Sequence, residues 1–252
     1  MEIKSLKSLY IEVKYNEVTL GSATGFVVEY NLKKYFITNR HVVTGRHNET
    51  GECMNSMGAI PNILRVVVPI IKDNSAAWNS FEINLYDKKD NKKWIEHPTY
   101  GEDIDVAAIE LCDFEYDSLA YQIYSDGEVA VTDTVYIIGY PYGYSVLPGD
   151  KKVAIWTAGS VASEPELGIN KKGIQLPAFL VDAKTRCGQS GSPVFYHNNN
   201  GVKRDGNRIS VFGVPVSFNV GIYSGRINKD SDLGYVWKWS VIKEILDSNN
   251  KK

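Results

Sequence analysis

The sequence predicts an all-β protein in two strand-rich halves, of β-sandwich or β-barrel type, with one helix at the C-terminal end. Short runs of alternating apolar and polar residues recur along the chain, and turn residues separate them. Clear helical spacing is found only near the C-terminus. A length of 252 residues is compatible with an all-β architecture folded as one unit.

Strand patterns fill most of the first half. Residues 10–15, Tyr-Ile-Glu-Val-Lys-Tyr, alternate with the period of two expected of a strand that buries one face. The same reasoning predicts strands at residues 23–30, 34–38, 64–72, 81–86 and 106–111. A short helical turn is expected around His41. Residues 47–62 lack any periodicity, which predicts a long loop.

The second half repeats this texture, with strands predicted at residues 129–131, 134–140, 153–162, 178–182, 192–196, 209–216 and 234–237. The acidic stretch 113–127 separates the two halves. Near the end, Ser240 can cap a helix whose apolar residues share one face: Val241, Ile242, Ile245 and Leu246. We expect residues 1–115 and 116–239 to form the two halves of a single unit, and residues 240–252 a helix and tail packed on its outside.

Composition argues against several kinds of partner. The net charge is −2 and the pI about 6.1, so no basic surplus favours nucleic acid or an anionic membrane. Cys53, Cys112 and Cys187 are too few and too scattered for a disulfide framework, and no His/Cys cluster has zinc spacing. The N-terminus lacks the apolar core of a signal peptide, and the apolar run at residues 63–71 is too short to span a bilayer. We expect a cytoplasmic protein without a metal or cofactor.

The strongest local chemical signal is the run Gly188-Gln189-Ser190-Gly191-Ser192-Pro193. Glycines on both sides of Ser190 permit a tight backbone path that can direct the N–H groups of Gly188 and Ser190 to one point. Such a point is an oxyanion hole beside a nucleophilic hydroxyl. An ordinary Gly/Ser turn is the other interpretation of this run taken alone.

A serine nucleophile needs a base, and the base needs an acceptor that fixes its tautomer. Of the four histidines, only His41 directly follows an apolar strand, where a rigid sheet can hold it, and the other three fit solvated loops. Asp105 is the last acid before the strand predicted at 106–111, so it can point inward. Asp103, two residues earlier, is the alternative.

The chain order His41, Asp105, Ser190 separates two kinds of serine hydrolase. An α/β-hydrolase carries its serine before the acid and the histidine, in a Gly-x-Ser-x-Gly elbow. Here Ser192 occupies the last position of that motif, and no alternating helices are predicted. The order is that of the chymotrypsin-type triad. It puts base and acid in the first half and the serine in the second, so we expect two six-stranded antiparallel β-barrels with the site between them.

Five segments in order resemble the trypsin-like (chymotrypsin-fold) serine peptidases, and bacterial HtrA/Deg-type protease domains most of all: residues 22–28, 37–43, 105–107, 138–143 and 181–193. The resemblance implies a serine endopeptidase acting on protein or peptide. It implies His41 as general base, Asp105 as its orienter, Ser190 as nucleophile, and the N–H groups of Gly188 and Ser190 as the oxyanion hole. The short tail after residue 246 leaves no room for a PDZ domain, so a stand-alone protease domain is expected.

Two departures from that family matter. Gln189 stands where the digestive enzymes have an acid that pairs with a freed N-terminus, so activation by propeptide cleavage is not expected. Ser192 replaces the usual second glycine after the serine. Together with the long loop 47–62, this departure leaves a second function open. The chain could be a latent protease, or a non-catalytic peptide-binding or scaffold module, that a regulatory protein partner activates or docks to. An esterase or transferase acting on a non-peptide acyl group would use the same machinery.

By resemblance, two segments line the pocket that selects the substrate side chain: Lys184, Thr185, Arg186 and Cys187, and then Phe212, Gly213 and Val214. Lys184 favours an acidic side chain before the scissile bond if its charge enters the pocket. If its stem lies along the wall with the charge in water, the pocket is apolar. We expect a small or apolar preference.

Overall fold

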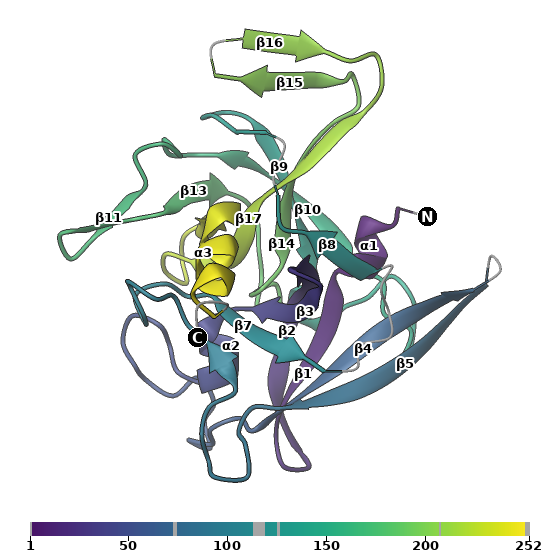
Figure 1. Ribbon diagram of the computed structural model, residues 1–252, viewed down its shortest axis with the longest axis vertical. Helices are drawn as coiled ribbons and strands as arrows, with labels where there is room; N and C mark the ends of the chain where they lie inside the picture. The colour runs from purple at the N-terminus through teal and green to yellow at the C-terminus, as the bar shows by residue number, and fades with distance from the viewer. Residues whose placement is uncertain (1, 73–74, 113–118, 125–126, 207, 250–252) are drawn as a thin grey trace.

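Strands dominate a computed structural model of the chain, and they form two large sheets with a helix packed beside them (Figure 1). The structure describes residues 2–72, 75–112, 119–124, 127–206 and 208–249. Much of the connection predicted at 113–127, namely residues 113–118 and 125–126, lies outside the described residues. The predicted all-β class with a C-terminal helix is confirmed.

The N-terminal sheet is built from the strands β1 (Leu9–Tyr15), β2 (Val18–Tyr30), β3 (Lys33–Thr38), β4 (Ile63–Lys72), β5 (Ser75–Asn84), β6 (Trp94–Ile95), β7 (Ala107–Leu111) and β8 (Ala120–Gln122). Their order is β5-β4-β1-β2-β3-β7-β6, and β8 pairs with β2 in parallel. This sheet therefore has eight strands where the sequence predicted six. The sequence did not predict the short strands β6 and β8, because two or three residues are too few to show an alternation of apolar and polar residues.

The second sheet is a closed barrel of six strands, as predicted: β9 (Thr134–Gly139), β10 (Ile155–Val161), β13 (Ala178–Asp182), β14 (Pro193–Asn198), β17 (Val216–Arg226) and β18 (Leu233–Lys238). Its order around the barrel is β10-β13-β18-β17-β14-β9. Two hairpins extend from it, β11 (Ile169–Lys171) with β12 (Ile174–Leu176), and β15 (Val202–Asp205) with β16 (Arg208–Val211) (Figure 1).

Two predicted strands of the second half are wrong. The run 209–216 does not form one strand, because Gly213 takes a left-handed φ of 68° and Pro215 has no N–H to donate to a ladder. The long strand β17 begins only at Val216. Residues 129–131 form no strand either: the Ala130 N–H bonds the Asp133 side chain, and a turn follows.

Helices are short except at the C-terminal end: α1 (Lys4–Lys7), α2 (Arg40–Thr44), a 3₁₀ turn (Pro141–Gly143) and α3 (Trp239–Asn249). The turn predicted around His41 is α2. In α3 the predicted apolar face is fully buried: Val241, Ile242, Ile245 and Leu246. Within the described chain, no helix is long and apolar enough to cross a membrane.

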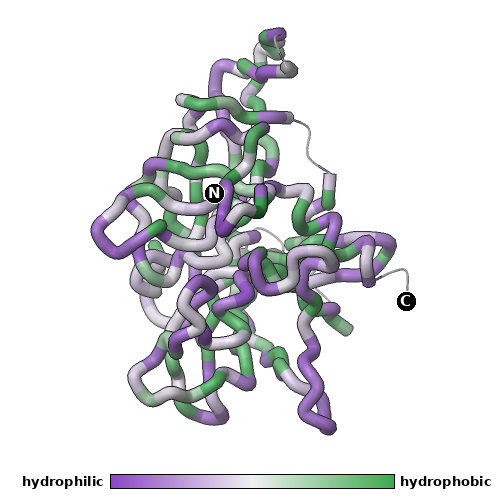
Figure 2. The backbone as a smooth tube through the Cα atoms, turned by 90° about the vertical axis from the view of Figure 1, so that its left-hand side faces the viewer, coloured by the Kyte–Doolittle hydropathy of each residue, from purple (hydrophilic) through white to green (hydrophobic). Residues whose placement is uncertain are grey.

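One hydrophobic core joins the two sheets. Phe26 and Ile37 of the N-terminal sheet share a buried cluster with Ile138 and Ile222 of the barrel and with α3. Two further clusters fill the N-terminal sheet and the barrel separately. Hydrophobic and hydrophilic positions alternate along the strands, whereas hydrophilic residues gather at protruding turns (Figure 2). Because the shared core holds both sheets, residues that follow β3, precede β7 and lie on β17 can meet at one site with fixed geometry.

Candidate active site

His41 lies in α2, directly after β3, where the backbone on both sides is held. The Asn39 amide donates to the Asp105 carbonyl oxygen at 2.7 Å, and both residues are buried. Gly45 ends the short helix in a left-handed conformation, and its N–H donates to the His41 carbonyl. His41 itself is 9% exposed, so its ring has little freedom to move.

Asp105 lies just before β7 and is 3% exposed. Its Oδ1 accepts the His41 backbone N–H at 2.8 Å, and its Oδ2 lies 2.6 Å from His41 Nδ1. An ionised carboxylate only accepts hydrogen bonds, so this contact requires the proton on Nδ1 and leaves Nε2 as the free acceptor. Asp103, the alternative, is half-buried and does not line the pocket.

Ser190 lies in a turn whose glycines leave no room for side chains. Gly188 and Gly191 have φ of 92° and 84°, and a Cβ on either would approach a backbone oxygen, to 2.3 Å of Tyr140 and to 2.0 Å of Thr24. Thr24 of β2 anchors the turn, because its N–H donates to the Ser190 carbonyl at 2.9 Å and its Oγ1 to the Gly188 carbonyl at 2.8 Å. The serine is therefore pinned to the N-terminal sheet.

Gln189 closes the same turn from inside the barrel. It is fully buried, its Oε1 accepts the Arg186 N–H at 2.8 Å, and its Nε2 donates to Thr157 Oγ1 at 2.9 Å. Ser192 is also fully buried, and its N–H donates to the Gln189 carbonyl. The turn is thus stabilised by contacts within the chain.

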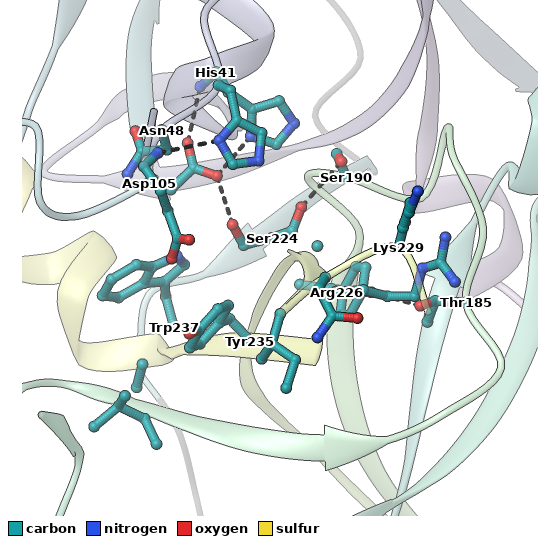
Figure 3. Close-up of a pocket in the computed structure, with 18 of the residues that line it drawn as sticks. His41, Asn48, Asp105, Thr185, Ser190, Ser224, Arg226, Lys229, Tyr235 and Trp237 are labelled. Atoms are coloured by element: carbon teal, nitrogen blue, oxygen red, sulfur yellow. Dashed lines mark hydrogen bonds and ion pairs between the residues drawn. The ribbon is translucent and has the colours of Figure 1, made fainter. Parts of the chain in front are cut away.

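The Ser190 hydroxyl donates to the carbonyl oxygen of Ser224 at 3.0 Å (Figure 3). The Ser224 side chain in turn donates to Asp105 Oδ2 at 2.5 Å. Ser224 therefore links the serine turn to the carboxylate that holds His41. Among the described residues, Ser190 and His41 share no hydrogen bond, and the N–H groups of Gly188 and Ser190 donate to no acceptor.

A pocket of about 290 Å³ brings His41, Asp105 and Ser190 together (Figure 3). Of the predicted specificity residues, Thr185, Arg186 and Cys187 line it. Lys184 is exposed and lies outside it.

Phe212, Gly213 and Val214 are not in the pocket, which corrects the sequence-based assignment. They lie in the exposed connection between β16 and β17. The pocket is lined instead by Ser224, Gly225 and Arg226, at the C-terminal end of β17. The resemblance placed the pocket wall in the connection before β17, whereas the wall lies at the C-terminal end of that strand.

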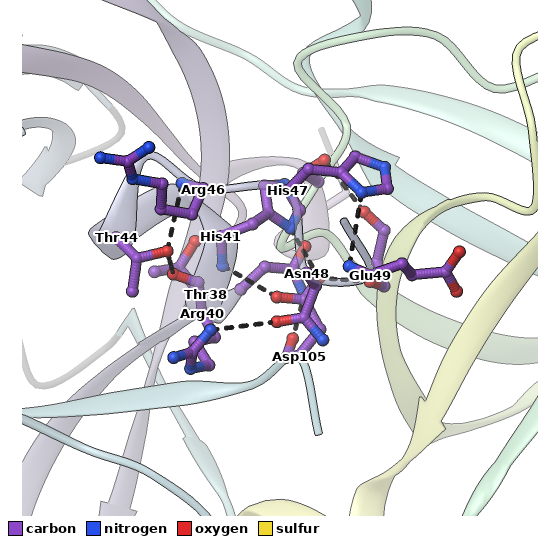
Figure 4. Close-up of polar contacts among 12 residues, drawn as sticks. Thr38, Arg40, His41, Thr44, Arg46, His47, Asn48, Glu49 and Asp105 are labelled. Atoms are coloured by element: carbon purple, nitrogen blue, oxygen red, sulfur yellow. Dashed lines mark hydrogen bonds and ion pairs between the residues drawn. The ribbon is translucent and has the colours of Figure 1, made fainter. Parts of the chain in front are cut away.

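Sequence reasoning missed two further walls. One is the start of the loop after α2, with His47, Asn48 and Glu49, and the other is the β11–β12 hairpin. Arg40 donates to Asn48 Oδ1 (Figure 4). The Asn48 amide nitrogen donates to the Glu102 carbonyl oxygen. Glu49 then pairs with Lys171 of the hairpin at 3.2 Å. The alternating pattern of residues 216–226 could have revealed β17 and Ser224, but a non-periodic loop carries no such signal.

Two buried residues with hydroxyl groups, Thr185 and Tyr223, line the pocket. Thr185 Oγ1 and Tyr223 Oη lie 2.5 Å apart, and both residues are buried. Burial raises the pKa of Tyr223 to about 12, so this phenol is neutral at ordinary pH. Over the described part of the chain, no group of three or more His, Cys, Asp or Glu side chains is arranged to hold a metal ion.

The chain is similar to known proteins in sequence family and in fold. The family model described as Trypsin-like peptidase domain matches residues 23–202. Similar solved structures include a mutant of Rv3671c from M. tuberculosis H37Rv in its inactive form, at 15% identity and a TM-score of 0.54, over 99% of this chain and 89% of that chain. The serine endoprotease from Yersinia pestis has 13% identity and a TM-score of 0.55, over 97% of this chain and 62% of that one.

The protease Anisep from Arthrobacter nicotinovorans has 14% identity and a TM-score of 0.55, over 98% of this chain and 97% of that one. At such identities, the likeness shows the fold. No curated protein sequence matches the chain.

Proposed function

Since this chain belongs to the trypsin-like peptidase domain family and is a serine-type peptidase, we propose that it is an endopeptidase that cleaves proteins or peptides through a covalent acyl-enzyme on Ser190. One observation carries the proposal. His41, Asp105 and Ser190 line the same pocket, with His41 Nδ1 at 2.6 Å from the Asp105 carboxylate. That contact leaves His41 Nε2 free to accept a proton, which is the arrangement that acyl transfer by serine requires.

The proposed reaction assigns one role to each group. His41 Nε2 takes the Ser190 proton as the hydroxyl oxygen attacks the peptide carbonyl, and then gives it to the leaving amine. Asp105 keeps the His41 ring oriented and stabilises its charged form. Water then attacks the acyl group: His41 Nε2 takes a proton from the water and gives it to the Ser190 oxygen as the bond to the acyl group breaks. Ser190 donates to the Ser224 carbonyl at rest, so its hydroxyl must first turn toward His41.

The N–H groups of Gly188 and Ser190 are the proposed oxyanion hole. Thr24 draws the Gly188 and Ser190 carbonyls toward β2, and neither of the two N–H groups has an acceptor within the described chain. Preorganised, unpaired donors of this kind stabilise the oxyanion of a tetrahedral intermediate.

Substitution of the proposed nucleophile and base tests this function. Ser190→Ala and His41→Ala should abolish cleavage of an unfolded protein such as casein, because each removes a group that forms or breaks bonds. Ser190→Ala should also lose labelling by a fluorophosphonate probe. Ser217→Ala, on the same strand as Ser224 but bonded to the Tyr196 carbonyl, and His197→Ala are the matched controls. Unchanged casein cleavage by Ser190→Ala would contradict the assignment of Ser190 as the nucleophile.

The hydrogen bond from Ser190 to Ser224 also supports a second candidate, a latent form that a regulatory protein partner activates, or a non-catalytic peptide-binding module. The same probe separates these possibilities. Labelling of the isolated protein at Ser190 favours the active endopeptidase. Labelling only after a partner is added favours the latent form, and peptide binding without labelling favours the module. Labelling without proteolysis indicates a non-peptide acyl substrate.

A further inference from the structure

The pocket beside Ser190 concentrates positive charge in a chain whose net charge is −2. Four cationic residues line it: Lys171, Arg186, Arg226 and Lys229. Its acids are already engaged, because Glu49 pairs with Lys171 and Asp105 is held by His41 and Ser224. Within the described chain, no acid forms an ion pair with the other three cations.

These cations belong to the segments that hold the serine. Arg226 ends β17, two residues after Ser224, whose carbonyl accepts the Ser190 hydroxyl. Arg186 opens the turn that Gln189 closes, four residues before Ser190. In Figure 3, Ser190, Arg226, Lys229 and Thr185 lie on one side of the pocket, and Trp237 lies on the other. A substrate side chain that enters on this side meets the cations next to the reacting hydroxyl.

The charged groups on this side, Arg186, Arg226 and Lys229, carry hydrogen-bond donors and no acceptors in their side chains. Arg186 and Arg226 are half-buried, and Arg186 uses one N–H on the Thr185 carbonyl at 2.7 Å. A guanidinium has five N–H groups, so most remain available. Burial raises the pKa of the Tyr223 phenol to about 12, so this group adds no negative charge to the pocket at neutral pH.

A carboxylate is the natural complement of such a surface. It only accepts hydrogen bonds, and its two oxygens match the fork of a guanidinium. A lysine or arginine side chain would meet like charge and be rejected. The structure therefore changes the small or apolar preference expected from the sequence.

We propose that this pocket selects glutamate or aspartate immediately before the scissile bond, with Arg226 and Arg186 as the residues that bind the carboxylate. The proposal deepens the proposed peptidase function and rests on it. The apolar walls formed by Ile169, Leu176 and Ala178 pack against the methylene groups of the substrate side chain. A pocket that combines cationic residues with apolar walls recognises a peptide with an acidic side chain at this position.

A matched peptide series tests the proposal. The peptides differ only at the residue before the scissile bond, as Glu, Asp, Gln, Leu or Lys. The wild-type kcat/KM should be about tenfold or more higher for Glu than for the isosteric Gln, because a charge-assisted hydrogen bond adds to binding at that position. Arg226→Gln should reduce this Glu-to-Gln ratio at least tenfold. Arg208→Gln, which removes an exposed arginine on β16 outside the pocket, is the charge-matched control.

A binding measurement keeps the test independent of turnover. Ser190→Ala should bind the labelled Glu peptide about tenfold more tightly than the Gln peptide in fluorescence anisotropy, and Arg226→Gln on that background should remove the difference. Equal affinities, or faster cleavage of the Leu peptide than of the Glu peptide, would overturn the acidic preference and leave the peptidase function standing. Loss of the peptidase function alone shows as no fluorophosphonate labelling, with the binding difference retained.

Discussion

Asp105 is the residue on which the geometry of the candidate site depends most. Its carboxylate accepts the His41 N–H, contacts the His41 ring and accepts the Ser224 hydroxyl, all while 3% exposed. Each of these donors would lose its acceptor if the carboxylate moved away. The orientation of His41 is thus controlled by a single buried carboxylate, which lies just before β7 and 64 residues further along the chain.

Asp105→Asn should lower kcat on the order of 10⁴-fold, because an amide nitrogen placed against Nδ1 selects the wrong tautomer of His41. KM should change far less, since the carboxylate does not touch substrate in the proposed mechanism. The measurement is steady-state cleavage of a fluorogenic peptide, with thermal unfolding to verify folding. Asp103→Asn is the control, as that side chain lies outside the pocket. A larger loss in Asp103→Asn would move the orienting role to Asp103.

At the scale of elements, α3 connects the strands that carry the site. It packs against β6 and β7 of the N-terminal sheet and against β17 and β18 of the barrel. Asp105 lies just before β7, and Ser224 lies on β17. The buried face of α3 belongs to the core shared by both sheets. The helix therefore helps to hold the Asp105 carboxylate and the strand of Ser224 in fixed positions relative to each other.

Ile245→Ala should destabilise the protein by about 2–5 kcal/mol, because it removes a fully buried side chain and leaves a cavity in the shared core. Urea unfolding at neutral pH measures the free energy. Lys243→Ala is the control on the same helix, since its ion pair with Asp247 is exposed to solvent and adds little to stability. Equal losses from the two variants would contradict the role given to the buried face.

At the scale of the whole molecule, buried tyrosines couple stability to alkaline pH. Burial raises the pKa of Tyr121, Tyr140 and Tyr223, the last from 10.0 to about 12. Tyr140 donates to the Ser8 carbonyl at 2.8 Å, and its side chain belongs to the core between the sheets. Unfolding lets these phenols ionise near pH 10, whereas the folded protein keeps them neutral.

The free energy of unfolding should therefore fall as pH rises above 10. The contribution of Tyr223 is complete below pH 10 and is lost as pH rises through about 12, at up to about 1.4 kcal/mol per pH unit. Tyr223→Phe should make the fall of the unfolding free energy with pH shallower, by the slope that corresponds to the release of about one proton on unfolding. Urea unfolding measured from pH 8 to 11.5 gives this slope. Tyr144→Phe, at a side chain 68% exposed, is the control. An unaltered slope in Tyr223→Phe would refute the coupling.

The sequence by itself determined the all-β class, most strands of both sheets, the buried face of α3, and the three residues that meet at the pocket. These features are local, since an alternating pattern, an i, i+3, i+4 pattern or a serine between glycines can be recognised within a few residues. The division of the chain into halves at residues 115 and 239, and the catalytic roles of His41, Asp105 and Ser190, stay predictions.

Only the tertiary structure decided what surrounds those three residues. Thr24 anchors the serine turn, Ser224 binds Asp105, and Arg226 brings its charge to the pocket, and each comes from a strand or strand end distant in sequence from its partner. The physical reason is register. One glycine and one proline at residues 213 and 215 delay the start of β17 to Val216, and the pairing of β17 with β14 and β18 decides which side chains lie at the pocket. Such a choice depends on pairing between strands far apart in the chain, which no local pattern contains.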